Sequence, residues 1–299
     1  MSLQVQQQVG LSDLTWWKVG GLADHFVSPS NEKEIGQALL WASEKGHPVT
    51  VLGGGSNVLI SDAGVEGLVI SLKNYTGVEA RQEDGRLVVV ATSGSSKAEV
   101  LRHFLKSKLA PALFLCGLPG DMGGGVVMNA GVSEKITPRE FHEIIDWFEV
   151  LREENGKLIT QCYKDSDVEW KYRKSEGWQP GVITRIQVSW DSAEDPDIPT
   201  KVKSATRSRL ARQPLNFPSG GSVFKNPVGR SSGALIDQSG LKGYTVGGAQ
   251  VSEKHANFIV NLGDATAKDV KSVIDYVRQT VQAEQGIELE TEVKLIGRW

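Results

Sequence analysis

The sequence has few residues of the kinds that form covalent or metal cross-links. Among its 299 residues there are only two cysteines, Cys116 and Cys162, and no CxxC pair. Two cysteines cannot hold together a chain of this length, so a disulfide-rich secreted scaffold is excluded and a reducing environment is expected. The same shortage leads us to expect no metal site.

Long apolar runs and an excess of one charge are also missing. Residues 1–10 have neither a basic start nor an apolar segment, so we expect no signal peptide. The longest stretch poor in charge, 110–133, contains prolines, several glycines and Asp121, which excludes a membrane helix. Lys and Arg number 33 and Asp and Glu 36, which argues against a nucleic-acid partner. The sequence therefore predicts a cytoplasmic protein without membrane insertion or an evident obligate protein partner.

Hydrophobic periodicity predicts an α+β fold. Apolar residues recur at helical spacing behind capping residues in three segments, which are 31–46, 96–109 and 266–285, and a basic segment at 200–212 is a further helix candidate. Alternating or β-rich runs predict strands at 48–52, 68–72, 87–91, 147–151, 158–162, 182–190 and 287–296. The Asn155-Gly156 pair between two of these strands is typical of a hairpin turn. The acidic, proline-bearing stretch 191–199 indicates a linker.

Glycine is abundant, at 33 residues, and it gathers in two loops. The first follows a predicted strand and contains Gly53, Gly54, Gly55, Ser56 and Asn57. Backbone N–H groups without a neighbouring Cβ can point at an anion, although a simple tight turn explains the same pattern. It is no dinucleotide fingerprint, because the third glycine of GxGxxG is replaced by Val58.

The second glycine loop, 117–131, reads as a long irregular run. It is almost free of large side chains and contains Gly117, Pro119, Gly120, Gly123, Gly124, Asn129, Ala130 and Gly131. Irregular runs of this length are uncommon unless they bind something, so we favour a flat ligand or a pyrophosphate over a merely packed loop.

Positive charge is concentrated between Asp197 and Asp237, an interval without any acidic residue. Its cations are Lys201, Lys203, Arg207, Arg209, Arg212, Lys225 and Arg230. A compact polyanion such as a nucleotide sugar or a dinucleotide phosphate is the expected partner. A nucleic-acid surface is disfavoured, because only Phe217 and Phe224 are available for stacking. A solvated helix face accounts for part of the set.

Three further positions could carry chemistry. Ser222 follows two glycines but lacks the GxSxG pattern of a nucleophile, so a structural hydroxyl or a proton donor is expected. Arg173 has a planar fork that matches a carboxylate, although its sequence context alone favours a solvated surface arginine.

The third position is Glu292, in the last predicted strand. Alternation there places Ile287, Leu289, Val293 and Leu295 toward a core, and Glu288, Glu290, Glu292 and Lys294 on the other side. That second face is either a solvated edge or, where it closes a cleft, a row of carboxylates suited to acid–base work.

Taken together, these segments resemble the UDP-N-acetylenolpyruvoylglucosamine reductases, in the shorter branch that lacks a tyrosine-bearing lid. The matching segments follow the family's order and cover nearly the whole chain. They are 15–21 (TWWKVGG), 51–60 (VLGGGSNVLI), 117–131 (GLPGDMGGGVVMNAG), 172–175 (YRKS), 219–227 (SGGSVFKNP), 235–251 (LIDQSGLKGYTVGGAQV), 255–261 (HANFIVN) and 289–297 (LETEVKLIG).

The resemblance implies a flavoprotein of peptidoglycan synthesis and cell wall biogenesis. Two FAD-binding subdomains of the vanillyl-alcohol-oxidase type, 1–72 and 73–192, would precede a substrate-binding domain at 200–299 whose last strand returns to the active site. NADPH would reduce FAD, and hydride would then pass from flavin N5 to the enolpyruvyl UDP-sugar, yielding UDP-N-acetylmuramate.

The resemblance also implies residue roles. Arg173 would bind the substrate carboxylate and stabilise the enolate, Ser222 would deliver the proton, and Glu292 would assist at the same centre. The residues named in the two glycine loops would hold FAD, whereas Tyr172, Lys225, Asn226 and Arg212 would bind the UDP-sugar.

Two positions depart from the family pattern. Asp121 stands where a small hydroxyl residue is usual, close to the expected flavin phosphates, and Thr291 replaces a common proline. Two other functions stay open at this point: a different flavin-dependent oxidase or dehydrogenase of the same fold, or a non-catalytic UDP-sugar-binding protein.

Overall fold

The computed structural model describes residues 3–132 and 135–299, which form two compact units. The first unit consists of the chain up to Gln6, Phe26–Gly54 and Gly67–Ser208. The second consists of Gln7–His25, Gly55–Glu66 and Arg209–Trp299. Neither unit is a continuous piece of sequence, because the chain passes between them several times. The predicted division at 1–72, 73–192 and 200–299 stays a prediction.

The first unit is built around an antiparallel sheet with the strand order β6-β7-β12-β8-β9. Its strands are β6 (Val78–Glu83), β7 (Arg86–Thr92), β8 (Ile145–Glu154), β9 (Lys157–Lys164) and β12 (Val182–Asp191). β8 and β9 pair from Trp147 opposite Lys164 to Glu154 opposite Lys157. The predicted hairpin turn is confirmed, since Asn155 and Gly156 both have positive φ, at 53° and 77°.

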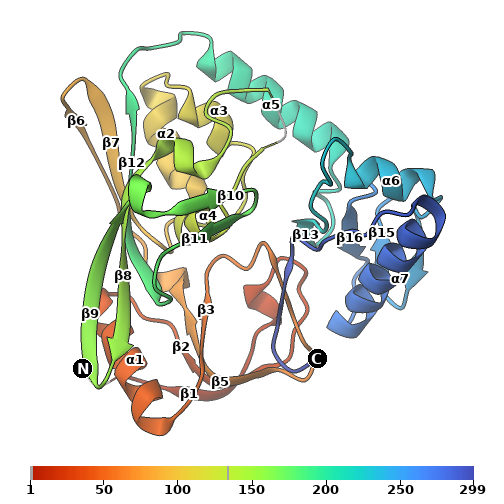
Figure 1. Ribbon diagram of the computed structural model, residues 1–299, viewed down its shortest axis with the longest axis horizontal. Coiled ribbons are helices and arrows are strands. Elements are labelled where there is room, and N and C mark those ends of the chain that lie inside the picture. The colour runs from red at the N-terminus through yellow and green to blue at the C-terminus, as the bar shows by residue number, and fades with distance from the viewer. Residues whose placement is uncertain (1–2, 133–134) are drawn as a thin grey trace. The chain divides into compact units, whose positions relative to one another are not determined.

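Helices α2, α3 and α4 cover one face of this sheet (Figure 1). The helices of the first unit are α1 (Glu32–Lys45), α2 (Lys97–Lys106), α3 (Pro111–Leu115), α4 (Met122–Val127) and most of α5 (Ile198–Arg212). The predicted caps form, because Asn31 accepts from the Glu34 N–H and Ser96 makes a capping box with Glu99. The helices expected at 31–46, 96–109 and 200–212 are confirmed, although α2 already ends at Lys106 and α5 already begins at Ile198.

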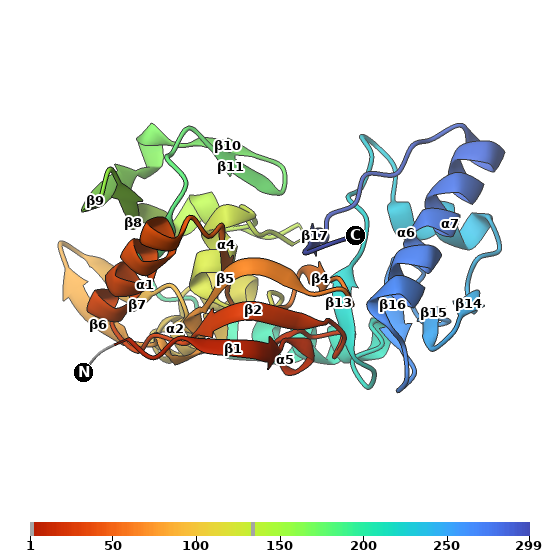
Figure 2. The same ribbon diagram turned by 90° about the horizontal axis from the view of Figure 1, so that it is seen from below.

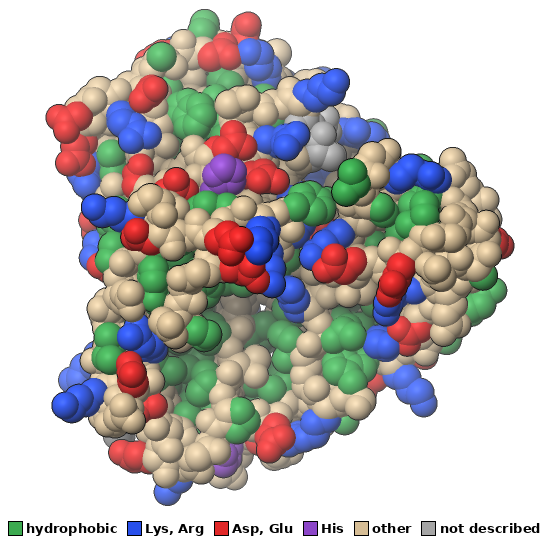
Figure 3. Space-filling model, viewed as in Figure 1, with side chains coloured by type: hydrophobic (Ala, Val, Ile, Leu, Met, Phe, Trp, Pro, Cys, Tyr) green, Lys and Arg blue, Asp and Glu red, His purple; other side chains and the backbone are tan. Residues whose placement is uncertain are grey.

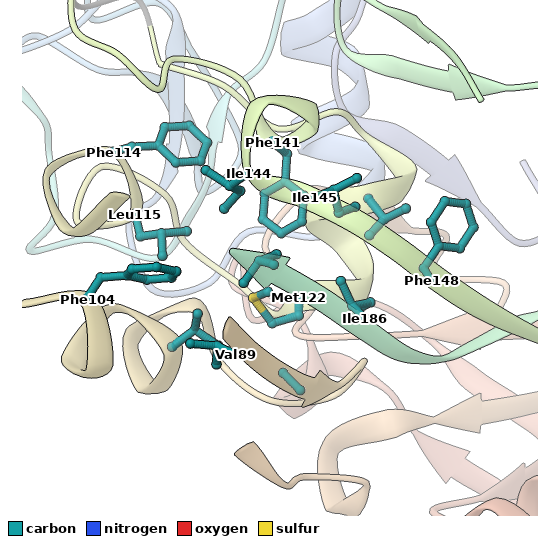
Figure 4. Close-up of a cluster of buried hydrophobic side chains, with 14 of the residues drawn as sticks. Val89, Phe104, Phe114, Leu115, Met122, Phe141, Ile144, Ile145, Phe148 and Ile186 are labelled. Carbon is teal, nitrogen blue, oxygen red and sulfur yellow. The ribbon is translucent and has the colours of Figure 1, made fainter. Parts of the chain in front are cut away.

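Aromatic and branched side chains fill the space between α2–α4 and the sheet (Figure 4). Phe104, Phe141 and Phe148 are completely buried there, and the Phe141 ring lies 6.5 Å from that of Phe114, centroid to centroid. A separate apolar cluster joins α1 to Leu151 and Val182.

The smaller elements of the first unit include a parallel pair and a short hairpin. β3 pairs with β5 from Val49 opposite Leu68, and β10 pairs with β11. Their bounds are β3 (Val49–Leu52), β5 (Val65–Ser71), β10 (Glu169–Lys171) and β11 (Lys174–Glu176). The chain passes from one unit to the other within three strands, which are β1 (Gln6–Gly10), β2 (Leu22–Val27) and β5. Single-turn 3-10 helices occur in this unit at Leu72–Asn74, Phe141–Ile144 and Asp165–Asp167, and in the second unit at Ser12–Leu14.

The second unit contains a small antiparallel sheet, β13-β16-β15-β14, with helices α6 and α7 beside it (Figure 2). Its elements are β13 (Ser219–Ser222), α6 (Ser232–Gln238), β14 (Thr245–Val246), β15 (Ala249–Val251), β16 (Phe258–Asn261) and α7 (Ala267–Gln285). A parallel pair joins β4 (Val58–Ile60) to β17 (Lys294–Ile296). Among the residues that the structure describes, no helix is long and apolar enough to cross a bilayer.

Helix α7 is fixed at its start by residues from distant parts of the chain. Thr266 and Asp269 form the predicted capping box, and the two carboxylate oxygens of Asp62 accept the N–H groups of Ala267 and Lys268 at 2.9 and 2.8 Å. The helix ends at Gly286, whose φ of 68° is left-handed. The predicted helix at 266–285 is confirmed.

The predicted strand at 287–296 is wrong for most of its length. Only Lys294–Ile296 is a strand, because the preceding residues meet the segment after β13, residues 223–225, through single backbone bonds and an isolated bridge and not through a continuous ladder. The alternation still places Leu289 and Val293 in the core, whereas Leu295 is 39% exposed, against expectation.

Replacing Phe141 by alanine should remove a central contact of the first unit. We expect the free energy of unfolding of this unit to fall by about 3–5 kcal/mol, because the ring is fully buried and leaves a cavity. The matched control is Phe217→Ala, whose ring is 40% exposed and whose loss should change stability by less than about 0.5 kcal/mol. Thermal and urea unfolding measure both, and equal effects would contradict the assigned core.

Candidate functional site

The two predicted glycine loops meet at one carboxylate in the first unit. Gly54 donates its backbone N–H to Asp121 Oδ2 at 2.6 Å, and Gly124 donates to Asp121 Oδ1 at 2.9 Å. Asp121 is the N-cap of α4. The prediction of an irregular run across 117–131 is therefore wrong at Met122–Val127, where the capped helix forms.

Several of these glycines are required by close packing. A Cβ at Gly53 would lie 2.2 Å from Asp121 Oδ2, and one at Gly125 would lie 2.5 Å from the Phe141 ring. Gly54 and Gly124 are also exposed, so their side-chain-free backbone is open to a flat ligand, although a Cβ at Gly124 would lie 2.9 Å from Asp121 Oδ1. Both interpretations therefore apply to these loops: some glycines are required by close packing, and some leave their backbone exposed to a ligand.

A buried lysine accompanies Asp121. The first residue of α2, Lys97, is 3% exposed, and its Nζ donates to the Pro119 carbonyl oxygen at 2.9 Å. Burial lowers the pKa of Lys97 to about 8, while the nearby negative charge of Asp121 acts to raise this pKa. Bare exposed backbone beside a cation fits an anionic cofactor such as FAD.

The β10–β11 hairpin carries the predicted carboxylate-binding arginine at its two-residue turn. Arg173 has a left-handed φ of 59°, and its guanidinium lies 4.6 Å from the centre of the Tyr172 ring. Its Nη2 donates to the Gly131 carbonyl oxygen at 2.9 Å. The structure therefore brings Arg173 and the second glycine loop together, and a Cβ at Gly131 would lie 2.7 Å from Arg173 Nη1.

Asn129 ties that loop to the hairpin. Its side chain is fully buried, and its Nδ2 donates to the Lys171 carbonyl oxygen at 3.1 Å and to Glu140 Oε2 at 3.0 Å. Its Oδ1 accepts from the His142 N–H at 3.1 Å. The amide predicted to contact the cofactor is thus directed into the protein, where it holds the strand leading to Arg173.

In the second unit, Ser222 ends β13 directly after Gly221, which has a φ of 75°. The neighbouring backbone is fixed by Asn257, which is 5% exposed. The Asn257 carbonyl oxygen accepts from Val223 N at 2.9 Å, and its side-chain amide bonds both backbone groups of Phe224 at 2.9 and 2.8 Å. The half-buried Ser222 therefore sits at the end of a rigid segment.

The chain segment carrying Glu292 lies against that same segment. Glu292 donates its backbone N–H to the Val223 carbonyl oxygen at 2.8 Å, and Asn57 Nδ2 donates to the Glu292 carbonyl oxygen at 3.2 Å. One step further, Lys225 N bonds the Glu290 carbonyl oxygen at 2.9 Å, and the two side chains form an ion pair at 2.5 Å. The structure thus brings Ser222, Lys225 and Glu292 together within the second unit.

The other predicted anion-binding residues are more scattered. Asn226 Oδ1 accepts from the Ser232 N–H at 3.0 Å, and Arg212 is exposed at the end of α5. Lys201 forms an ion pair at 2.6 Å with Asp195, which lies just before the interval that lacks acidic residues. Ile198 is the only buried residue of α5, so a solvated face accounts for its exposed cations Lys201, Lys203 and Arg207. On the face seen in Figure 3, charges of both signs are interspersed.

Two family models match this chain. One describes an FAD binding domain and covers residues 23–161, which include both glycine loops. The other describes the C-terminal domain of UDP-N-acetylenolpyruvoylglucosamine reductase and covers residues 213–296, which include Ser222 and Glu292.

Curated relatives match over nearly the whole length. A UDP-N-acetylenolpyruvoylglucosamine reductase of Acaryochloris marina is 38% identical, over 99% of this chain and 94% of its own. The chain belongs to this reductase family. A relative of the same name from Heliobacterium modesticaldum is 39% identical, over 98% of this chain and 91% of its own.

A solved member of the reductase family has the same fold. The crystal structure of the reductase from Thermus caldophilus superposes with a TM-score of 0.78 at 31% identity, covering 98% of this chain and 99% of its own. The predicted α+β class, with an FAD-binding part and a C-terminal part of the reductase family, is confirmed.

The sequence analysis missed three residues that support the candidate site. Lys97, Asn257 and Glu140 were given no role, because a lysine beside a capping serine and an asparagine before a strand carry no distinctive local pattern. Lys97 could have been noticed, since it begins a helix whose first turn should favour acidic residues.

Replacing Asn129 by alanine should loosen the Arg173 hairpin. We expect a loss of about 1–3 kcal/mol of stability, because the His142 N–H loses its partner in a partly buried place. Faster proteolysis within residues 165–178 should accompany it. Asn74→Ala is the matched control, because Asn74 is exposed. Unchanged cleavage and melting in Asn129→Ala would contradict the positioning role.

Proposed function

We propose that this chain reduces UDP-N-acetyl-3-O-(1-carboxyvinyl)glucosamine to UDP-N-acetylmuramate, with NADPH as reductant and FAD as cofactor. Two findings support the proposal: full-length relatives are named as the reductase, and the FAD binding model spans both glycine loops. The measurements on the two half-reactions also distinguish this function from two alternatives, which are another flavin-dependent oxidase or dehydrogenase and a non-catalytic protein that binds the sugar nucleotide.

FAD would be held by the two glycine loops. When bound, it supplies the two-electron transfer that links NADPH to the enol ether of the substrate. Backbone groups would face it from Gly53, Gly54, Gly55, Ser56, Asn57, Gly117, Pro119, Gly120, Gly123, Gly124, Asn129, Ala130 and Gly131. NADPH and the sugar nucleotide would use the site in turn.

Arg173 would bind the carboxylate of the substrate and stabilise the negative charge that develops there. A guanidinium fork matches a carboxylate in two parallel bonds, and it stays charged at every working pH. The Tyr172 ring and the Gly131 carbonyl limit its freedom before substrate arrives, which lowers the cost of orienting it.

The observation that carries the proposal is the adjacency of the Ser222 and Glu292 segments, because the Glu292 N–H donates to the carbonyl oxygen of Val223, the residue after Ser222. Ser222 would hand its proton to the α-carbon of the enolate, which is basic enough to take a proton from an alcohol. Glu292 would assist at the same centre by holding a proton or polarising the donor.

Lys225, Asn226, Arg212 and Tyr172 would bind the UDP part. Lys225 is the strongest member, because its side chain is only 16% exposed and its present partner, Glu290, is 73% exposed. A diphosphate could replace the exposed Glu290 carboxylate at little cost.

We also propose that the enzyme acts in the cytoplasm. We propose a division into two FAD-binding subdomains, 1–72 and 73–192, and a substrate-binding domain, 200–299.

Replacing Ser222 by alanine should separate the two half-reactions. The purified protein should be yellow, and NADPH should bleach it as fast as in the unaltered enzyme. Oxidation by the enolpyruvyl sugar nucleotide should slow by about 10²–10⁴-fold, because the proton donor is missing. Stopped-flow absorbance of the flavin measures each step.

Ser222→Cys is the matched variant, because it keeps an exchangeable proton and should retain more activity than the alanine. Normal turnover in Ser222→Ala would remove the proton-donor assignment. A flavin reoxidised rapidly by oxygen without need of a UDP group would indicate an oxidase. Sugar-nucleotide binding without NADPH consumption would indicate a binding protein.

A further inference from the structure

The carboxylate of Asp121, in the first unit, accepts hydrogen bonds from backbone N–H groups of both glycine loops. Its two oxygens accept from Gly54 and Gly124 at 2.6 and 2.9 Å, and the side chain as a whole is 6% exposed. It therefore places a buried carboxylate in the loops that the proposed function gives to FAD, at the position that the family resemblance places close to the flavin phosphates.

The glycines beside Asp121 make room for this carboxylate. A Cβ at Gly53 would lie 2.2 Å from Asp121 Oδ2, and one at Gly124 would lie 2.9 Å from Asp121 Oδ1. The carboxylate thus joins the end of β3 to the start of α4, at two positions where any larger residue would collide with it.

Lys97 supplies the opposite charge at the same place. Its N–H donates to the Gly120 carbonyl oxygen at 3.1 Å, and Met122 N donates to the Ser95 carbonyl oxygen at 2.9 Å. These bonds tie the beginning of α2 to the residues around Asp121. A lysine that is 3% exposed is costly to bury unless a negative group compensates it.

We propose that Lys97 and Asp121 act as a positioning pair for FAD: Asp121 links the two glycine loops, and Lys97 cancels its charge so that these loops accept an anionic cofactor. This inference rests on the proposed function. Without Lys97, a buried carboxylate and the diphosphate would repel each other where water screens the charges weakly.

The pair can be tested by titrating FAD into the apoprotein and following flavin fluorescence. Lys97→Met should weaken FAD binding at least tenfold, because Asp121 is left without compensation. Asp121→Ser should bind FAD within about threefold of the unaltered protein. The double variant should return to the affinity of Asp121→Ser, a rescue that lost packing alone would not produce. Additive effects, or no effect of Lys97→Met, would overturn the proposal.

The pH dependence gives a second readout. Burial lowers the pKa of Lys97 to about 8, and the negative charge of Asp121 acts to raise this pKa. The other carboxylate nearby on the same helix, Glu99, is bonded to Ser96. The cationic form prevails below this pKa, so FAD affinity should fall severalfold as the pH rises from about 7 to 9. Lys97→Met should lose this dependence; an unaltered profile in that variant would count against the pair.

Asp121→Asn keeps the proposal testable if Lys97→Met does not fold. It retains one acceptor oxygen and removes the negative charge, so FAD should bind at least as tightly as in the unaltered protein. A tenfold weaker complex of a folded Asp121→Asn, judged by circular dichroism, would overturn the charge argument. If the unaltered protein binds no FAD at all, the proposed function fails instead.

Discussion

Close contact between backbone segments is the constraint on which both units depend. A Cβ at Gly55 would lie 1.9 Å from the Leu14 carbonyl oxygen, and one at Gly220 would lie 2.4 Å from the Trp17 ring. Removing side chains at such points lets loops approach until polar groups meet directly. The abundant glycine is therefore as much a packing requirement as a means of exposing amides to a ligand.

The chemically important side chains are held mainly through their backbone. Asn257 fixes the residues after Ser222, the Val223 carbonyl receives the N–H of Glu292, and Asn129 fixes the strand before Arg173. Buried amides suit this task, because each can bond both a donor and an acceptor of a passing chain. The side chains to which we assign the chemistry are half-buried, whereas the amides that support them are buried.

Elements with a strong local signal could be predicted from the sequence. The capped helices and the Asn155-Gly156 hairpin form as expected, because their determinants lie within a few residues of one another. The alternation in 287–296 was read as a strand, yet the segment is shaped by isolated bonds to a distant part of the chain. The burial of Lys97 beside Asp121 likewise depends on contacts far apart in sequence, which no local pattern contains.

The Tyr172-Arg173 turn has an evolutionary consequence. β10 and β11 are each three residues long, and the guanidinium is directed by a single left-handed residue at their junction. One inserted or deleted residue would shift the pairing and turn the side chain to the opposite face. Insertions and deletions between homologous chains should therefore be rare at the Tyr172-Arg173 turn. They should be frequent at the exposed Asn155-Gly156 turn, which carries no residue of the proposed site.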